Sequence, residues 1–159
     1  MRYILIDKIE RVDYARRLRA VKTVSRSEDY FTDHFPGAPV MPGALLIECM
    51  AQAGTALLEL SEDLAVKALL VMVERAKFRA LVRPGDNLVI DVTLDSRDDT
   101  FARVGGTVRS RERVVADAAL TFSINDVNTF YPEAFRSMIR MAYADIMRDA
   151  LIGPFAEDS

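Results

Sequence analysis

The segment between residues 34 and 52 contains the residue types that acid–base catalysis requires. It begins with His34, the only histidine of the 159 residues, and continues through a loop rich in proline and glycine into an apolar stretch that bears one early carboxyl group, Glu48. Histidine titrates near neutral pH and can act as a general base. Apolar surroundings favour the protonated form of a carboxyl group, which can then act as a general acid. One short segment therefore supplies candidates for both proton-transfer roles.

The junction Pro42-Gly43 predicts the exposed N-terminus of a helix. Proline suits the first helical position, because its φ is fixed and its missing N–H would find no partner there. The amides of Gly43 and Ala44 then have no intrahelical acceptor and lie at the positive end of the helix dipole. Such amides can stabilise a carbonyl oxygen that gains negative charge, and glycine lets a substrate approach the backbone closely. Gly43 is therefore a candidate substrate-binding residue.

Residues 43–60 form the clearest predicted helix. Ala, Leu and Met are frequent in it, and apolar residues occupy almost every face, so we expect this helix to be buried. Gln52 follows Glu48 by four residues, which places it on the same face, where it can orient the carboxyl group. Cys49, the only cysteine, points elsewhere and is interpreted as a small core residue. A single cysteine excludes an intrachain disulfide and fits a reducing compartment.

Each of these features also has a plainer explanation. The Pro-Gly pair can simply begin a helix, His34 can cap a backbone group in a loop, and Glu48 can face solvent or pair with an arginine. Packing alone does not explain why all of them occur within one segment, which favours the chemical interpretation. No serine lies in a nucleophile-elbow context, so acyl-enzyme chemistry has no obvious carrier.

Length and composition indicate one soluble domain. The hydrophobic residues make up 50% of the chain and the charged residues 28%, which is sufficient for a packed core. A formal net charge of -3 argues against nucleic acid as the main partner. One histidine and one cysteine argue against the common zinc sites. No signal peptide or membrane span is expected, so the predicted location is the cytoplasm.

The remaining segments predict an α+β fold. The expected strands are separated by turn signals at residues 83–86 and 98–99, and strands in series around one buried helix indicate an antiparallel sheet curled about it. The Gly105-Gly106 pair predicts a bulge or a close backbone approach. An amphipathic helix is expected over residues 132–151. The strands are expected at residues 3–6, 15–24, 68–78, 88–94, 101–109 and 114–124, and the apolar stripe of the helix consists of Phe135, Met138, Ile139, Ala142 and Ile146.

The central motif resembles a known signature. The run His-Phe-Pro-Gly-x-Pro-Val-Met-Pro-Gly at residues 34–43, followed by Leu-Leu-Ile-Glu-x-Met-Ala-Gln at residues 45–52, is similar to that of the (3R)-hydroxyacyl-[acyl-carrier-protein] dehydratases of fatty-acid synthesis. The resemblance is to the branch with Glu at position 48, because the dehydratase/isomerase branch has Asp there. It covers about residues 3–124. Residues 79–82 depart from the pattern, since Arg-Ala-Leu-Val stands where the family usually has a second Arg and a Pro.

The resemblance implies a hot-dog fold in residues 1–124, followed by a helical extension of the same domain in residues 125–159. It also implies a homodimer, or a larger assembly of dimers, whose sheets join edge to edge. His34 of one subunit would be the base and Glu48 of the other the acid. The Gly43 amide would hold the thioester carbonyl, and Gln52 would support the carboxyl group. No metal and no cofactor is implied.

The implied reaction is the dehydration of a (3R)-3-hydroxyacyl group, carried by acyl-carrier protein, to the trans-2-enoyl thioester. We expect an apolar tunnel for the acyl chain, and we expect the extension to pack on the sheet or a neighbouring subunit or to narrow the tunnel. The alternatives are a hydratase or dehydratase of CoA or secondary-metabolite thioesters and a non-catalytic protein that binds acyl thioesters. The predicted lining residues are Phe31, Met50, Phe78 and Leu81. The residues predicted to dock the acidic carrier protein, unless they form a solvated strand edge, are Lys77, Arg79 and Arg83.

Overall fold

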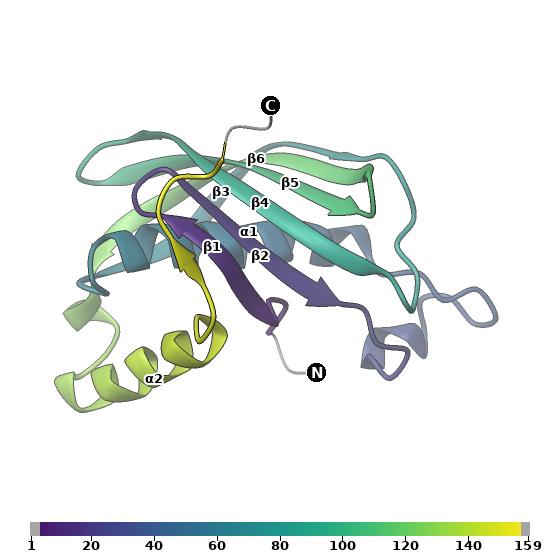
Figure 1. Ribbon diagram of the computed structural model, residues 1–159, viewed down its shortest axis with the longest axis horizontal. Coiled ribbons are helices and arrows are strands. Elements are labelled where there is room, and N and C mark those ends of the chain that lie inside the picture. Colours follow the sequence, from purple (N-terminus) through teal and green to yellow (C-terminus); the bar gives the residue numbers. More distant parts are fainter. Residues whose placement is uncertain (1–3, 157–159) are drawn as a thin grey trace.

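A seven-stranded sheet curls around one long helix, α1 (Gly43–Ser61), in the computed structural model, which describes residues 4–156 (Figure 1). The predicted α+β class and the central buried helix are confirmed. The other elements are β1 (Lys8–Asp13), β2 (Arg17–Thr23), η1 (Asp29–Phe31), β3 (Val66–Phe78), β4 (Asn87–Arg97), β5 (Phe101–Ser110), β6 (Arg113–Asp126), η2 (Val127–Thr129), η3 (Glu133–Phe135), α2 (Arg136–Ile146) and β7 (Leu151–Ile152).

The strands follow the order β3-β6-β5-β4-β2-β1-β7 across the sheet. Every neighbouring pair is antiparallel except β1 and β7, which are parallel. The antiparallel strands have one face against α1, and their alternating residues form the core with the helix. This order leaves β3 at one edge of the sheet and the short β7 at the other.

Two glycines let α1 and the sheet approach each other closely. A Cβ on Gly54 would lie 2.9 Å from Cζ of Phe122, and a Cβ on Gly106 would lie 2.8 Å from Sδ of Met50. The second contact confirms the predicted close approach at Gly105-Gly106, where the strand pairing continues without a register shift. By length and composition α1 could cross a membrane, but 61% of its most apolar window is buried in the fold, as expected for the core helix of a soluble protein.

The predicted strand at residues 3–6 is wrong, and Tyr3 itself lies outside the described residues. The first strand is β1, which begins at Lys8. Leu5 and Ile6 are only 2% and 4% exposed, so their apolar character reflects burial rather than strand pairing. The amide of Leu5 donates its hydrogen bond to the side chain of Gln52, 2.9 Å away, instead of to a neighbouring strand. The other predicted strands are confirmed, with ends that differ by a few residues.

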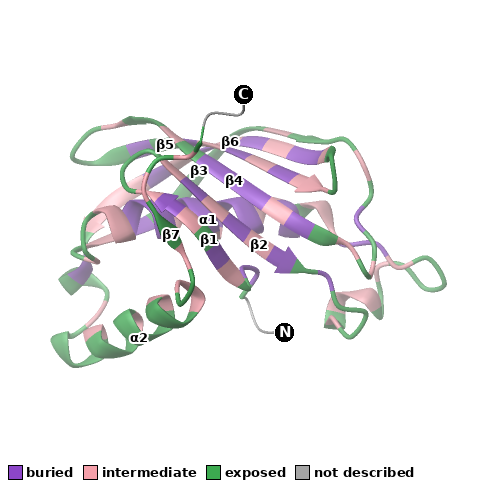
Figure 2. Cartoon of the chain, in the orientation of Figure 1, coloured by how far each residue is buried: buried purple, intermediate pink, exposed green. Residues whose placement is uncertain are grey.

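The predicted C-terminal helix over residues 132–151 is too long. The α-helix ends at Ile146, and the chain then reverses to form β7, which pairs with β1. Pairing with the otherwise open edge of β1 satisfies backbone groups that a longer helix would leave exposed. The predicted apolar stripe is also partly wrong, because Phe135 and Met138 are 48% and 58% exposed, whereas Tyr143 packs against the core. Figure 2 shows the contrast between the exposed α2 and the buried α1.

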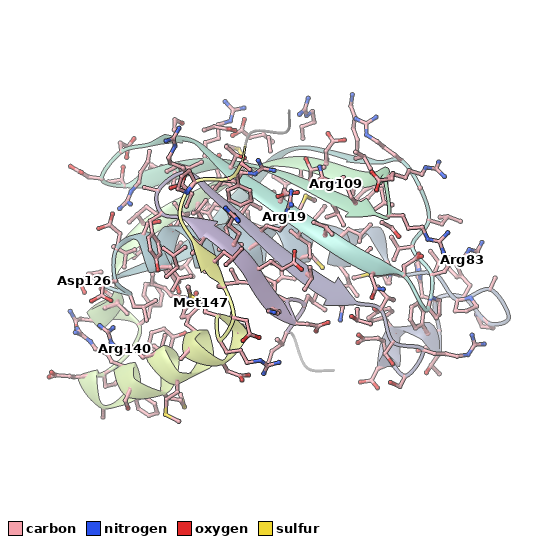
Figure 3. All side chains as sticks on the ribbon, in the orientation of Figure 1. Arg19, Arg83, Arg109, Asp126, Arg140 and Met147 are labelled. Atoms are coloured by element: carbon pink, nitrogen blue, oxygen red, sulfur yellow. The ribbon has the colours of Figure 1, made fainter. Side chains whose placement is uncertain are left out.

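The outer face of the sheet carries ion pairs rather than an apolar surface. Asp91 on β4 is 7% exposed and accepts hydrogen bonds from Arg17, Arg19 and Arg109. Figure 3 shows Arg19 and Arg109 above this face. Because Asp91 is compensated by three guanidinium groups, this face needs no further layer to cover it.

The environment of Cys49 leads to a prediction about its reactivity. The thiol is fully buried on α1, and burial raises its pKa to about 12. Since the thiolate is the reactive form, we expect iodoacetamide to modify native protein at about pH 8 at least 100-fold more slowly than unfolded protein. Mass spectrometry of samples quenched over time, with and without guanidinium chloride, measures the two rates. Equal rates would contradict the burial of Cys49.

Candidate active site

The loop before α1 fixes the orientation of the His34 ring. The main-chain N–H of His34 donates to the carbonyl of Tyr30 (3.1 Å), and the N–H of Val40 donates to the carbonyl of His34 (2.9 Å). The ring atom Nδ1 lies 2.9 Å from the carbonyl oxygen of Val40. A carbonyl oxygen can only accept, so Nδ1 carries a proton, and in the neutral imidazole Nε2 then keeps its lone pair. His34 therefore has the tautomer that can take up a proton at Nε2.

The carboxyl group of Glu48 is oriented by a hydrogen-bond chain that reaches the backbone. Gln52 Nε2 donates to Oε1 of Glu48 (2.9 Å), and Gln52 Oε1 accepts from the amide of Leu5 (2.9 Å). Because the Leu5 amide is a donor, the oxygen end of the Gln52 amide must face it and the NH₂ group must face Glu48. The sequence suggests the Glu48–Gln52 pair from its spacing, but it gives no signal for the third member, Leu5.

Gly43 begins α1 and lies against an aromatic ring. Pro42 is the N-cap rather than the predicted first helical residue, with φ −56° and ψ 135°, and no side chain within residues 4–156 caps this end of the helix. A Cβ on Gly43 would be 3.0 Å from Cε1 of Phe78. The helix N-terminus and Phe78 are thus brought together, and the missing side chain of Gly43 leaves room for the ring.

A cavity of about 970 Å³ runs along the face of α1 that the sheet does not cover. Glu48 and Gln52 border it, so the oriented carboxyl group lies at the wall of a largely apolar space. The remaining wall comes from the N-terminal segment, β3, Tyr131 and α2. The apolar residues that border the cavity, including two from α1, are Ile4, Ile6, Ala51, Ala56, Ala68, Leu69, Leu70, Met138, Ile139, Ala142 and Ile146.

The residues predicted to line the acyl tunnel do not border this cavity. Met50 is a core residue with no exposure and packs against Gly106, on the sheet side of α1. Phe31 borders a separate pocket of about 380 Å³ in the loop region, Phe78 covers Gly43, and Leu81 is 64% exposed. All four were predicted because they are apolar and lie near the motif in the sequence. The direction in which each side chain points is set by the fold instead.

A single chain does not bring His34 to the cavity beside Glu48. The loop that carries His34 lies at the end of the molecule where α1 begins, and α2 lies at the opposite end (Figure 1). Within the described part of the chain His34 is not among the residues that border the cavity. His34 and Glu48 of one chain therefore do not line the same cavity.

The edge strand β3 carries an exposed apolar surface. Five consecutive apolar residues of this strand are 36% to 54% exposed, although they occupy both faces of the sheet. Monomeric proteins rarely leave a long apolar edge strand open. The five are Leu69, Leu70, Val71, Met72 and Val73. This surface was not predicted, although a run of apolar residues without alternation signals it in the sequence.

Residues 4–156 contain no group of three or more His, Cys, Asp or Glu side chains that could hold a metal ion.

Comparisons with known proteins agree on one family. The FabA-like domain family matches residues 2–122. A 3-hydroxyacyl-[acyl-carrier-protein] dehydratase FabZ of Pelotomaculum thermopropionicum is 41% identical over 123 residues, which cover 77% of this chain and 88% of that protein. The protein of the same name from Lactobacillus helveticus is 37% identical over 124 residues, covering 77% and 84%. A solved hot-dog-like protein from Thermanaerovibrio acidaminovorans has a TM-score of 0.62 at 18% identity over 80% of this chain and 91% of that one, which shows the hot-dog fold.

Proposed function

The chain belongs to the FabZ branch of the FabA-like family, and we propose that it converts a (3R)-3-hydroxyacyl thioester on an acyl-carrier protein into the trans-2-enoyl thioester and water. The observation that carries this proposal is the Glu48 carboxyl group, oriented by Gln52 at the wall of an apolar cavity. The predicted role in fatty-acid biosynthesis follows from the same relatives. The assignment of residues 1–124 as the catalytic domain and the location in the cytoplasm remain part of the proposal.

In the proposed mechanism the thioester carbonyl accepts a hydrogen bond from the Gly43 amide. Nε2 of His34 removes the proton from C2, and negative charge develops on the carbonyl oxygen, where the amide stabilises it. The C3–O bond then breaks, and Glu48 protonates the departing hydroxyl group, so that water leaves. The electron pair of the former C2–H bond becomes the second bond between C2 and C3. The Val40 carbonyl stabilises the imidazolium through Nδ1–H.

The proposed active site lies between two subunits. Pairing of β3 with the same strand of a second copy would cover the apolar edge and join the two sheets across a twofold axis. This arrangement is supported by the exposure of residues 69–73 and by the position of His34 outside the cavity of its own chain. Each dimer would contain two sites, each with His34 of one subunit and Glu48 of the other.

The proposed carrier-protein surface consists of Lys77, Arg79 and Arg83, all of which are exposed. Arg79 is paired with Asp117 through a 2.7 Å contact, so part of its charge is already compensated. Arg83 lies at the end of the molecule that carries the His34 loop (Figure 3). An acidic carrier bound there would place its pantetheine arm near the start of α1.

The test is the turnover of purified protein with 3-hydroxyacyl thioesters on acyl-carrier protein and on CoA. We expect enoyl thioester from the (3R) isomer, little from the (3S) isomer, and a higher kcat/KM for the carrier-bound substrate. A preference for CoA would favour the alternative hydratase. Binding without turnover of any thioester would overturn the proposal in favour of a non-catalytic acyl-thioester-binding protein.

A further inference from the structure

The helix α2 lies outside the part of the chain that the FabA-like family covers, yet it forms one wall of the cavity beside Glu48. The family match ends at residue 122, whereas α2 begins at Arg136. Four aliphatic residues of α2 border the cavity, namely Met138, Ile139, Ala142 and Ile146. We infer that α2 is the end wall of the acyl-chain site and limits the length of the chain that the enzyme accepts. This inference rests on the proposed function.

The cavity has the direction and chemistry of a site for a hydrocarbon chain. Glu48, Ala51, Gln52, Thr55 and Ala56 all border it, and they follow one face of α1. At the rise of an α-helix, the distance from Glu48 to Ala56 is about 12 Å. An acyl chain whose reacting carbons lie at Glu48 can therefore extend along α1 toward the end where α2 lies, between aliphatic side chains.

The far end of the cavity is polar, which gives the apolar path a defined end. Glu59 is 3% exposed. Its carboxylate accepts hydrogen bonds from Tyr143 Oη (2.6 Å) and from the Ala68 amide (3.2 Å), and it forms an ion pair with Lys67 Nζ (2.8 Å). Lys67 and Tyr143 also border the cavity. Of these groups Lys67 keeps contact with water, since its side chain is 22% exposed. A hydrocarbon chain that reached Lys67 would remove this contact without supplying a hydrogen bond, at a cost in free energy.

The same cluster connects α2 to the hot-dog domain. Burial, and then the Glu59 carboxylate, raise the pKa of Tyr143 far above its usual range, so the phenol remains a donor. Arg140 Nη1 lies 3.1 Å from Asp63 Oδ1, beyond the end of α1 (Figure 3 shows Arg140 on α2). After α2, the pairing of β7 with β1 fixes the other end of the extension. The contacts of Arg140 and Tyr143 thus connect α2 to the hot-dog domain, and β7 connects the segment that follows it.

The wall can be tested by filling the cavity from α2. Ala142 faces the cavity, whereas the neighbouring Met141 is 72% exposed and does not border it. We expect Ala142→Trp to lower the ratio of kcat/KM for a twelve-carbon over a four-carbon enoyl thioester by at least about tenfold, because each methylene group that loses its site weakens transition-state binding. The matched control, Met141→Trp on the outer face of α2, should leave this ratio as in the wild type.

A binding measurement separates this inference from the proposed function. Calorimetric titration with a twelve-carbon enoyl-pantetheine thioester should give at least about tenfold weaker binding to Ala142→Trp than to Met141→Trp. If the wild type turns over no thioester, the proposed function fails, and this titration still decides whether α2 forms the wall. Equal chain-length ratios and equal affinities in the two variants would overturn the inference. The inference would also be overturned if Ala142→Trp changed the mass of the oligomer but left the chain-length ratio of kcat/KM unchanged. In that case the partner subunit, and not the acyl chain, would occupy the cavity.

Discussion

Replacing His34 by alanine should lower kcat/KM for hydration of a crotonyl thioester by about 10²–10⁴-fold, the usual contribution of a general base. The Glu48→Gln variant should lose a similar factor, because the amide keeps an oxygen for the Gln52 hydrogen bond but cannot donate a proton to the leaving hydroxyl group. The loss of enoyl absorbance measures both rates. Unchanged thermal unfolding would show that the loss is chemical, and activity within about threefold of wild type would remove these residues from the mechanism.

Mixing the two inactive variants tests whether the site is shared. In a mixed dimer, one site would combine the intact His34 with the intact Glu48, and the other site would lack both. Random assembly places half of the subunits in mixed dimers, so co-expression should restore about one quarter of the wild-type activity. If each site were built within one chain, every mixture would stay as inactive as its components. The activity of the co-expressed variants, compared with that of each variant alone, therefore decides whether one site is built from two subunits or from one.

Replacing Lys67 by methionine should destabilise the fold by about 3 kcal/mol, because it leaves the buried Glu59 carboxylate without its cation. The Glu59 side chain is 4% exposed and that of Lys67 is 22% exposed, so water compensates the lost charge poorly. Urea denaturation followed by circular dichroism gives the free energy of unfolding. Lys77→Met on the same strand is the matched control, since Lys77 is exposed and its loss should change stability by less than about 0.5 kcal/mol.

A second substitution should reverse the effect of the first. Glu59→Gln removes the negative charge, keeps an oxygen for the Ala68 amide and offers an NH₂ group to the Tyr143 oxygen. The double variant Lys67→Met/Glu59→Gln should therefore recover most of the lost stability. If it is as unstable as Lys67→Met alone, the aliphatic stem of Lys67 and not its charge is what stabilises this end of α1.

The parts of the fold that follow from local sequence could be predicted, and the parts that depend on distant partners could not. The helix over residues 43–60 was confirmed because its composition, its start at Pro-Gly and its burial agree. The strand expected at residues 3–6 was wrong because Leu5 and Ile6 are buried without pairing to a strand. The Leu5 amide donates its hydrogen bond to the side chain of Gln52 on α1. The helix expected to reach residue 151 ends at Ile146 because β1 offers backbone partners to residues 151 and 152.

The same distinction holds for the candidate site. The Glu48–Gln52 contact is a local feature, since four residues make one helical turn, and the spacing anticipated it. The walls of the cavity come from α1, β3, the N-terminal segment and α2, which are distant in sequence, so proximity to the motif was a poor guide to the lining residues. Glu59 and Tyr143 are 84 residues apart, and neither was singled out in advance.

The attachment of β7 to β1 has a consequence for how copies of this protein can associate. A curled sheet with unpaired backbone groups on both edge strands could pair with another molecule at each edge and form an open-ended polymer. Here one edge of the sheet is the two-residue strand β7, which is followed by Gly153 and Pro154. Proline has no N–H to donate to a strand of another molecule. The opposite edge, β3, carries the exposed apolar residues 69–73, so of the two edges of the described sheet it is the one suited to pair with a second molecule.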